Sequence, residues 1–145
     1  MPSEDVTLDR EAPARSHATS AHLPEARMTE IVFPDHTNHL GTLFGGQALA
    51  WMDKAAFIVA SRHARCTVVT ARSEKIDFTA SVPTGALVDL IARIVAVGRS
   101  SMQVDVELHC EQLHNGQSRL ATRGRFTMVA LDAKGQPTAV PPLPG

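Results

Sequence analysis

The sequence predicts an α+β domain in which an antiparallel sheet of five to six strands wraps around one long central helix. The run Gly45–Ala64 contains no proline and is rich in helix-forming residues. Because this run is mostly apolar, the helix needs an apolar surface to cover it. Extended segments joined by short turns then follow one another without further helices. One sheet curled around one helix is the simplest fold that satisfies this order.

Strands are expected on both sides of the helix. Before it, a short strand spans Met28–Phe33 and ends at Pro34, which cannot continue a strand ladder. The pair Asn115-Gly116 is typical of a tight β-hairpin turn and separates the last two strands. Alternating or β-branched residues mark four longer strands after the helix, at Thr67–Phe78, Ala86–Val97, Ser101–Leu113 and Arg119–Asp132.

Two flanking segments lie outside the predicted domain. Residues 1–27 are polar and small and show no helical or strand period, which indicates a flexible N-terminal arm. Residues 137–145 contain four prolines and cannot enter a sheet interior, which indicates a Pro-rich C-terminal tail. The domain is therefore expected to span residues 28–136.

Composition and charge argue against several classes of protein. The chain has 145 residues, with 14 Lys and Arg against 15 Asp and Glu, which is not the basic excess of a nucleic-acid-binding protein. No apolar run approaches the ~18 residues of a membrane span, and the acidic first residues lack the apolar core of a secretory signal. Cys66 and Cys110 form no metal-binding motif. We therefore expect a cytoplasmic protein with no metal site and no nucleic-acid or membrane partner.

One carboxylate interrupts the apolar pattern of the helix. Asp53 lies four residues after Leu49 and four before Phe57, so the three side chains share one helix face. If that face is buried, the carboxylate is costly unless it is paired, and a broken rule of this kind often marks a functional residue. An exposed Asp53 beside Lys54 on a solvated face is the alternative interpretation.

Flexible and polar residues gather where the helix should begin. Gly45 and Gly46 at this position would let a ligand approach the backbone N–H groups that have no partner within the helix. Those donors and the helix dipole can hold an anion or a developing oxyanion. Asn38, seven residues before Gly45, is a third polar candidate. A plain turn into the helix, with Asn38 shaping the loop, would explain the same residues.

Helix geometry sets a condition on any chemistry that these residues share. Gly45 and Asp53 are eight residues apart, or about 12 Å along a straight helix. A base and an oxyanion donor must both reach one small carbonyl group. Two antiparallel copies of the helix would bring Asp53 of one subunit to Gly45 and Asn38 of the other. A catalytic interpretation therefore predicts a dimer with two equivalent shared sites.

The block 35–46, DHTNHLGTLFGG, followed by Trp51-Met52-Asp53, resembles the signature of YciA-like acyl-CoA hydrolases. These enzymes are hotdog-fold thioesterases, and weaker similarity to them extends over residues 28–142. The resemblance implies a hotdog fold, dimers that often assemble as trimers of dimers, and hydrolysis of acyl-CoA thioesters to free fatty acid and CoA. It implies no cofactor, because coenzyme A is part of the substrate.

The resemblance also implies roles for single residues. Asp53 would act as general base or nucleophile, Asn38 would position the water or the thioester, and the N–H of Gly45 or Gly46 would polarise the thioester carbonyl. A polar turn would hold the phosphates of CoA by charge and by hydroxyl donation, although an ordinary hairpin turn is the alternative. This turn contains Arg99, Ser100 and Ser101.

Two other functions fit the same fold. Hotdog dehydratases use a histidine together with an acid, and His36 and His39 lie near the glycines, so an enoyl-CoA hydratase or dehydratase is one alternative. A non-catalytic acyl-CoA-sensing module that uses the same cleft is the other. The sequence has no GxSxG nucleophile elbow and no cysteine in a recognised nucleophile motif. Thioester hydrolysis by a carboxylate is therefore the preferred hypothesis.

Overall fold

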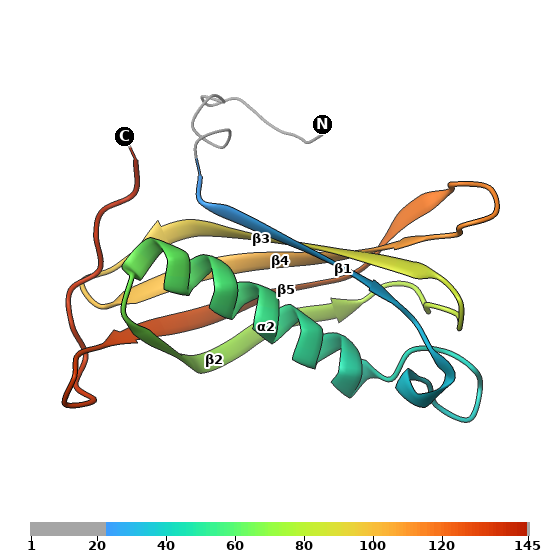
Figure 1. The fold of residues 1–145 in the computed structure, drawn as a ribbon, viewed down its shortest axis with the longest axis horizontal. Coiled ribbons are helices and arrows are strands. Elements are labelled where there is room, and N and C mark those ends of the chain that lie inside the picture. The colour runs from blue at the N-terminus through green and yellow to red at the C-terminus, as the bar shows by residue number, and fades with distance from the viewer. Residues whose placement is uncertain (1–22, 145) are drawn as a thin grey trace.

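One antiparallel sheet and one long helix make up the fold. The computed structural model describes residues 23–144. The strands follow the spatial order β1-β3-β4-β5-β2, and the helix α2 lies across one face of the sheet (Figure 1). This arrangement confirms the predicted α+β fold, with five strands. A short 3-10 helix, η1, spans Pro34–His36, α2 spans Gly45–Ala64, and strands β1 to β5 span Glu25–Ile31, Thr67–Phe78, Leu87–Val97, Ser101–Glu111 and Ser118–Leu131.

The first strand begins earlier than expected. β1 starts at Glu25, so residues 25–27 of the expected flexible arm belong to the sheet instead. The Glu25 carboxylate accepts hydrogen bonds from Arg27 at 2.8 Å and from Arg93 at 2.9 Å, while Ala26 is buried on the other face. These charged residues carry no apolar signal, which is why the pattern misses this end of the strand. Residues 1–22 of the expected arm lie outside the described residues.

The Pro-rich tail runs back along the sheet. The N–H of Thr138 donates to the carbonyl of Ala130 at 2.9 Å, and the N–H of Val140 donates to the carbonyl of Arg99 at 2.8 Å. The side chain of Val140 packs against the core. The tail therefore covers the end of the molecule at which α2 ends (Figure 1).

Burial alternates along the central strands. Through most of β3 and β4, every second side chain is buried, as expected for a sheet with one covered face. The helix covers that face with a stripe that includes four alanines, and such small side chains let the helix lie close to the sheet. The buried stripe of α2 consists of Ala48, Trp51, Met52, Ala55, Ala56, Val59 and Ala60.

The chain reverses direction after the helix. Arg65 adopts a left-handed φ of 56°, and its N–H donates to the Ser61 carbonyl at 2.8 Å, so α2 stops here. β2 then runs back beside α2 toward the end at which the helix began (Figure 1). Among the described residues, no helix is both long enough and apolar enough to cross a membrane.

A bulge interrupts the ladder between β2 and β5. The register shifts between Glu74 and Asp77, and Lys75 in this segment has a φ of 56°. The bulge places Ile76 over Gly124 of β5, where any side chain on Gly124 would collide with Ile76 Cδ1. Gly124 therefore leaves room for the Ile76 side chain.

β2 lies at the edge of the sheet and carries exposed apolar side chains. It pairs only with β5, and most of its side chains are exposed. Val69 is 42% exposed and Phe78 is 54% exposed, and Phe57 on the neighbouring face of α2 is 47% exposed. An unpaired strand edge beside exposed apolar side chains is a surface that a second chain can cover.

Candidate active site

Asp53 lies beside β2 on a half-exposed face of α2. The hydroxyl of Thr70 donates a hydrogen bond to Asp53 Oδ1 at 2.6 Å. The buried stripe of the helix includes Met52 but not the Leu49–Asp53–Phe57 face, so Asp53 is neither fully buried nor fully solvated within one chain. The carboxylate is therefore held by one short hydrogen bond at the edge of the core.

Thr70, which contacts Asp53, is not among the residues that the sequence singles out. It lies near the start of β2 and pairs with Met128 of β5. Its hydroxyl contacts both Asp53 and Met128 Sδ, the second at 3.5 Å. No motif marks a single threonine in an extended segment, and only the packing of β2 beside α2 reveals its partner.

Asp53 lines a shallow hollow of about 330 Å³ on the surface of the molecule. Gly46 lines the same hollow, seven residues earlier on the helix and hence about 10 Å away along its axis. The structure thus places two of the predicted site residues on one surface, though at opposite ends of it. The lining residues are Gly46, Leu49, Ala50, Asp53, Thr70, Ser73 and Phe126.

The start of α2 presents unused hydrogen-bond donors. The first bond within the helix runs from the N–H of Ala48 to the Phe44 carbonyl, at 3.0 Å. Within residues 23–144, the N–H groups of Gly45, Gly46 and Gln47 have no hydrogen-bond acceptor. The first turn carries no acidic side chain, so the positive end of the helix dipole is not compensated there. This terminus can therefore stabilise a negatively charged oxygen.

Asn38 both shapes its loop and keeps a donor available. Its Oδ1 accepts hydrogen bonds from the N–H groups of Leu40 and Thr42, at 2.9 and 3.3 Å, and from the Thr42 hydroxyl at 3.2 Å. In the described part of the chain, Nδ2 of Asn38 makes no hydrogen bond. The loop is joined to the start of α2, because the N–H of Phe44 donates to the His36 carbonyl at 3.0 Å.

His36 is used in the local structure. Its Nδ1 accepts a hydrogen bond from the N–H of Phe33 at 3.0 Å, and its ring packs edge-on against Trp51 with 5.0 Å between ring centroids. His39 is exposed on the loop. The two contacts of His36, with Phe33 and with Trp51, hold its ring in the local structure and do not favour the hydratase or dehydratase alternative, which needs a histidine available for proton transfer.

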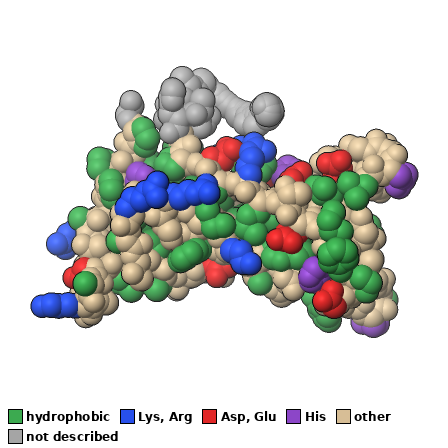
Figure 2. All heavy atoms as spheres, viewed as in Figure 1, with side chains coloured by type: hydrophobic (Ala, Val, Ile, Leu, Met, Phe, Trp, Pro, Cys, Tyr) green, Lys and Arg blue, Asp and Glu red, His purple; other side chains and the backbone are tan. Residues whose placement is uncertain are grey.

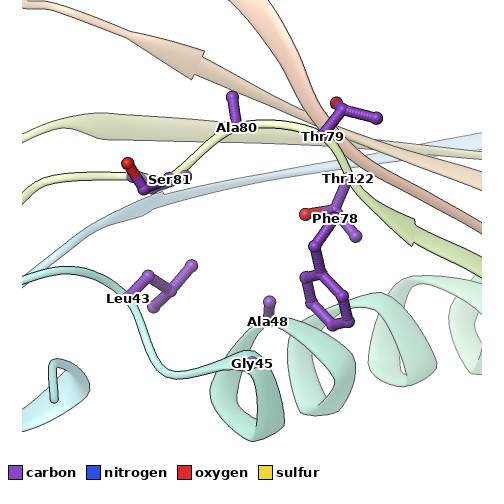
Figure 3. Close-up of a pocket in the computed structure, with 9 residues that line it drawn as sticks. Leu43, Gly45, Ala48, Phe78, Thr79, Ala80, Ser81 and Thr122 are labelled. Carbon is purple, nitrogen blue, oxygen red and sulfur yellow. The ribbon is translucent and has the colours of Figure 1, made fainter.

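A second, larger cavity of about 440 Å³ lies on the other side of the helix start. Gly45 forms part of its wall, and a side chain added at Gly45 would lie 3.4 Å from the ring of Phe78. Figure 3 shows the residues around it, which come from the loop before α2, the start of α2, the end of β2, the loop that follows β2, and β5. They are Leu43, Gly45, Ala48, Phe78, Thr79, Ala80, Ser81, Val82 and Thr122.

The predicted phosphate-binding turn lies at the opposite end of the same chain. It joins β3 to β4 near the end of α2 (Figure 1), whereas Gly45 lies at the start of this 20-residue helix. The N–H of Gly98 donates to the Ser101 carbonyl at 2.8 Å, and the N–H of Ala130 donates to the Ser100 carbonyl at 2.9 Å. The backbone therefore fixes the turn, and the Arg99 side chain is exposed. Within one chain, the turn is not brought to the helix start.

Two further observations concern the charged groups of the molecule. Within the described residues, no group of three or more His, Cys, Asp and Glu side chains is arranged to hold a metal ion.

Figure 2 shows basic side chains toward the end of the molecule at which α2 ends, where the last helical turn contains Arg62. The end that carries the phosphate-binding candidate turn is therefore basic.

Comparison with known sequences gives a consistent result. Residues 40–116 match the model of the thioesterase superfamily. An uncharacterized acyl-CoA thioester hydrolase of Zymomonas mobilis is 40% identical over 82% of this chain and 80% of its own length. The acyl-CoA thioester hydrolase YciA of Escherichia coli is 32% identical over 86% of this chain and 98% of its own length.

Solved structures agree with the sequence comparison. An acyl-CoA hydrolase of Staphylococcus aureus, solved with butyryl-CoA, CoA and CoA disulfide, is 36% identical, with a TM-score of 0.79 over 85% of this chain and 74% of its own. The same enzyme has been solved with an asparagine, an aspartate or a threonine replaced by alanine. A hexameric acyl-CoA thioesterase without ligand is 38% identical, with a TM-score of 0.82 over 86% of this chain and 80% of its own.

The sheet order and the single long helix are thus those of the hotdog fold, as the resemblance implied. The sequence relationship to these hydrolases extends over most of the chain. The chain belongs to the thioesterase superfamily, and within it to the acyl-CoA thioester hydrolases.

Proposed function

We propose that this acyl-CoA thioester hydrolase uses Asp53 as its catalytic carboxylate and assembles its active site from two subunits. The observation that carries the proposal is the hydrogen bond of 2.6 Å from the Thr70 hydroxyl to Asp53 Oδ1. This bond restrains the orientation of the carboxylate, and Asp53 also lines the hollow in which the reaction would take place. Asp53 then either removes a proton from the attacking water or attacks the thioester carbonyl itself to form an anhydride that water hydrolyses.

The developing negative charge needs donors that are already in place. The N–H groups of Gly45 and Gly46 are suited to this task because they have no acceptor in the described structure and lie at the positive end of the helix dipole. The Nδ2 group of Asn38 would donate to the water or to the thioester. Water adds to the carbonyl carbon, the C–S bond breaks, and the products are a carboxylic acid and the CoA thiol.

The two halves of this chemistry come from different subunits in the proposal. Asp53 is about 12 Å along α2 from Gly45. The exposed Phe57 shares one helix face with Asp53, so a second chain covering this face would bring its own helix start toward the carboxylate. The hexameric assembly of a similar thioesterase supports association of such dimers into a trimer of dimers.

Substrate binding follows from the same geometry. We place the acyl chain in the cavity beside Gly45, which is lined mainly by apolar side chains and leads inward from the helix start. The CoA phosphates would bind at the turn that contains Arg99, Ser100 and Ser101, at the basic end of a neighbouring subunit. Antiparallel helices bring this end of one chain near the helix start of the other.

Spacing in a relative supports the choice of residues. In the S. aureus acyl-CoA hydrolase, the asparagine, aspartate and threonine replaced by alanine are separated by 15 and 17 residues. The same spacings separate Asn38 from Asp53 and Asp53 from Thr70. We therefore include Thr70 in the proposed site as a positioning residue for the carboxylate.

Hydrolysis can be tested by release of free thiol from a panel of acyl-CoAs. We expect Asp53→Ala and Asp53→Asn to lose about 10²- to 10⁴-fold in kcat, because both remove the base or nucleophile. Asp89→Asn is the matched control, since Asp89 accepts a hydrogen bond from Thr29 on the sheet and lies apart from α2. Full activity in the Asp53 variants would refute the assignment, and CoA binding without hydrolysis by the wild type would favour the sensing module.

The shared site has an independent test. Mixtures of Asp53→Ala and Asn38→Ala protomers should regain activity, because half of the sites in a heterodimer would combine an intact Asp53 with an intact Asn38. Absence of any regained activity in verified heterodimers would contradict sharing between subunits.

A further inference from the structure

Thr122 is a polar residue on the inner face of β5. Farther along the strand, the inward side chains include Phe126, Met128 and Ala130, which are all buried and apolar. Thr122 is only 2% exposed and pairs with Phe78 of β2. A hydroxyl in a row of apolar side chains breaks the burial pattern, and such exceptions often have a function.

The hydroxyl of Thr122 is directed into a cavity. Its side chain makes no hydrogen bond to another of the described residues. Among these residues, Ser61 Oγ is the only fully enclosed side-chain polar atom without a hydrogen-bond partner, so the unpaired Thr122 hydroxyl is not fully enclosed. The Thr122 hydroxyl is therefore not sealed in the core but borders the cavity of about 440 Å³ beside Gly45. Figure 3 shows its oxygen directed into the space on the side of Leu43 and Ser81.

The surroundings of this hydroxyl are mostly apolar. The cavity walls near it are formed by Leu43, Ala48 and Val82 and by the Phe78 ring. The neighbouring Thr79 hydroxyl already donates to the Ala121 carbonyl at 3.1 Å. Thr122 is thus a buried hydroxyl available to an occupant of the cavity, and the occupant would enter past the start of α2.

We propose that Thr122 determines acyl specificity, and that the enzyme prefers acyl groups that carry a hydroxyl or oxo group close to the thioester carbonyl. This inference depends on the proposed function, which places the carbonyl at Gly45 and the acyl chain in this cavity. A threonine hydroxyl both donates and accepts, so it can pair with either substituent.

The preference follows from desolvation. A plain alkyl chain that fills the cavity displaces water from the Thr122 hydroxyl and leaves this polar group without a partner. A hydroxyl or oxo group on the acyl chain replaces the lost hydrogen bond. Sites that hydrogen-bond a substrate discriminate more strongly than apolar pockets do, because the unmatched substrate leaves their buried polar group unpaired.

The test compares butyryl-CoA with 3-hydroxybutyryl-CoA, 4-hydroxybutyryl-CoA and acetoacetyl-CoA, through kcat/KM for thiol release. We expect wild type to favour at least one of the three oxygenated substrates over butyryl-CoA by about tenfold or more. Thr122→Val keeps the shape of the side chain without its hydroxyl, and it should abolish or reverse that ratio. Thr122→Ser should keep the ratio. Thr127→Val is the matched control, because Thr127 lies on the same strand and bonds to Gln103 rather than to the cavity.

The outcomes separate this inference from the proposed function. Two results would overturn the role of Thr122 and leave the thioesterase site intact. One is that wild type hydrolyses all four substrates without preferring an oxygenated one, and the other is that Thr122→Val keeps the wild-type ratio. Absence of hydrolysis of every acyl-CoA would refute the proposed function itself. If Thr122→Val does not fold, as judged by its melting curve, the wild-type ratio and its retention in Thr122→Ser decide the question.

Discussion

At the scale of single residues, one hydrogen bond distinguishes Asp53 from an ordinary surface carboxylate. Thr70 is exposed on an edge strand, but its hydroxyl is directed to Asp53 Oδ1. A hydrogen bond to an ionised group contributes more than one between neutral groups, because the charge strengthens it. The orientation of Asp53 therefore depends on a residue that lies 17 positions later in the chain.

This contact gives a prediction for Thr70→Val. We expect kcat to fall by about tenfold to a hundredfold with little change in KM, because the variant loses a hydrogen bond to a charged group that orients catalysis but does not bind CoA. Thr70→Ser keeps the hydroxyl and should restore most of the rate. Thr67→Val, at the exposed start of the same strand, serves as control. Equal loss in the valine and serine variants would show that packing, and not the hydroxyl, is responsible.

At the scale of elements, ion pairs cross the outer face of the sheet. Arg125 of β5 donates to both oxygens of Asp105 of β4, at 2.7 and 3.1 Å, and this pairing raises the pKa of the guanidinium. On β4, His109 Nε2 lies 3.0 Å from Glu107 Oε1. The hydrogen bond from His109 lowers the pKa of Glu107 below its usual 4.5, against the opposing effect of burial.

The lowered pKa of Glu107 predicts how stability changes with pH. A carboxylate whose pKa is lower in the folded state stabilises the fold above its unfolded pKa, and this stabilisation is lost as pH falls through the folded pKa. Wild type should therefore exceed Glu107→Gln in unfolding free energy at pH 7. The difference should shrink from pH 4.5 downward. Urea unfolding of both proteins between pH 7 and pH 3 measures it, and a difference independent of pH would contradict the assignment.

At the scale of the whole molecule, one side exposes large apolar side chains that would be more stable if they were buried. Phe57 on α2 is exposed on the face that lies toward the edge strand β2, and Phe44 and Phe78 are exposed near the helix start. Figure 2 shows apolar side chains gathered toward that end of the molecule. Association with a second copy would bury this side and complete the proposed site.

Disruption of this surface should affect assembly and activity together. We expect Phe57→Lys to lower the molecular mass seen by light scattering and to reduce kcat/KM at least about tenfold, because a charge at the centre of an apolar interface is costly to bury. Leu113→Lys is the matched control, since Leu113 is 54% exposed but lies on the β4–β5 hairpin. A monomeric Phe57→Lys variant with full activity would show that one chain suffices.

The sequence by itself determined the order of the elements, the single long helix and the residues Asp53, Gly45, Gly46 and Asn38 as candidates, because periodicity, glycine placement and a local motif are short-range properties. The first three residues of β1 escaped this reasoning because charged side chains cover its outer face. Only the tertiary structure decided that Thr70 bonds to Asp53 and that Thr122 faces a cavity, and that the turn at Arg99 lies at the far end of the chain from Gly45. Those facts depend on how β2 and β5 register beside α2, and strand register is set by contacts between residues far apart in sequence.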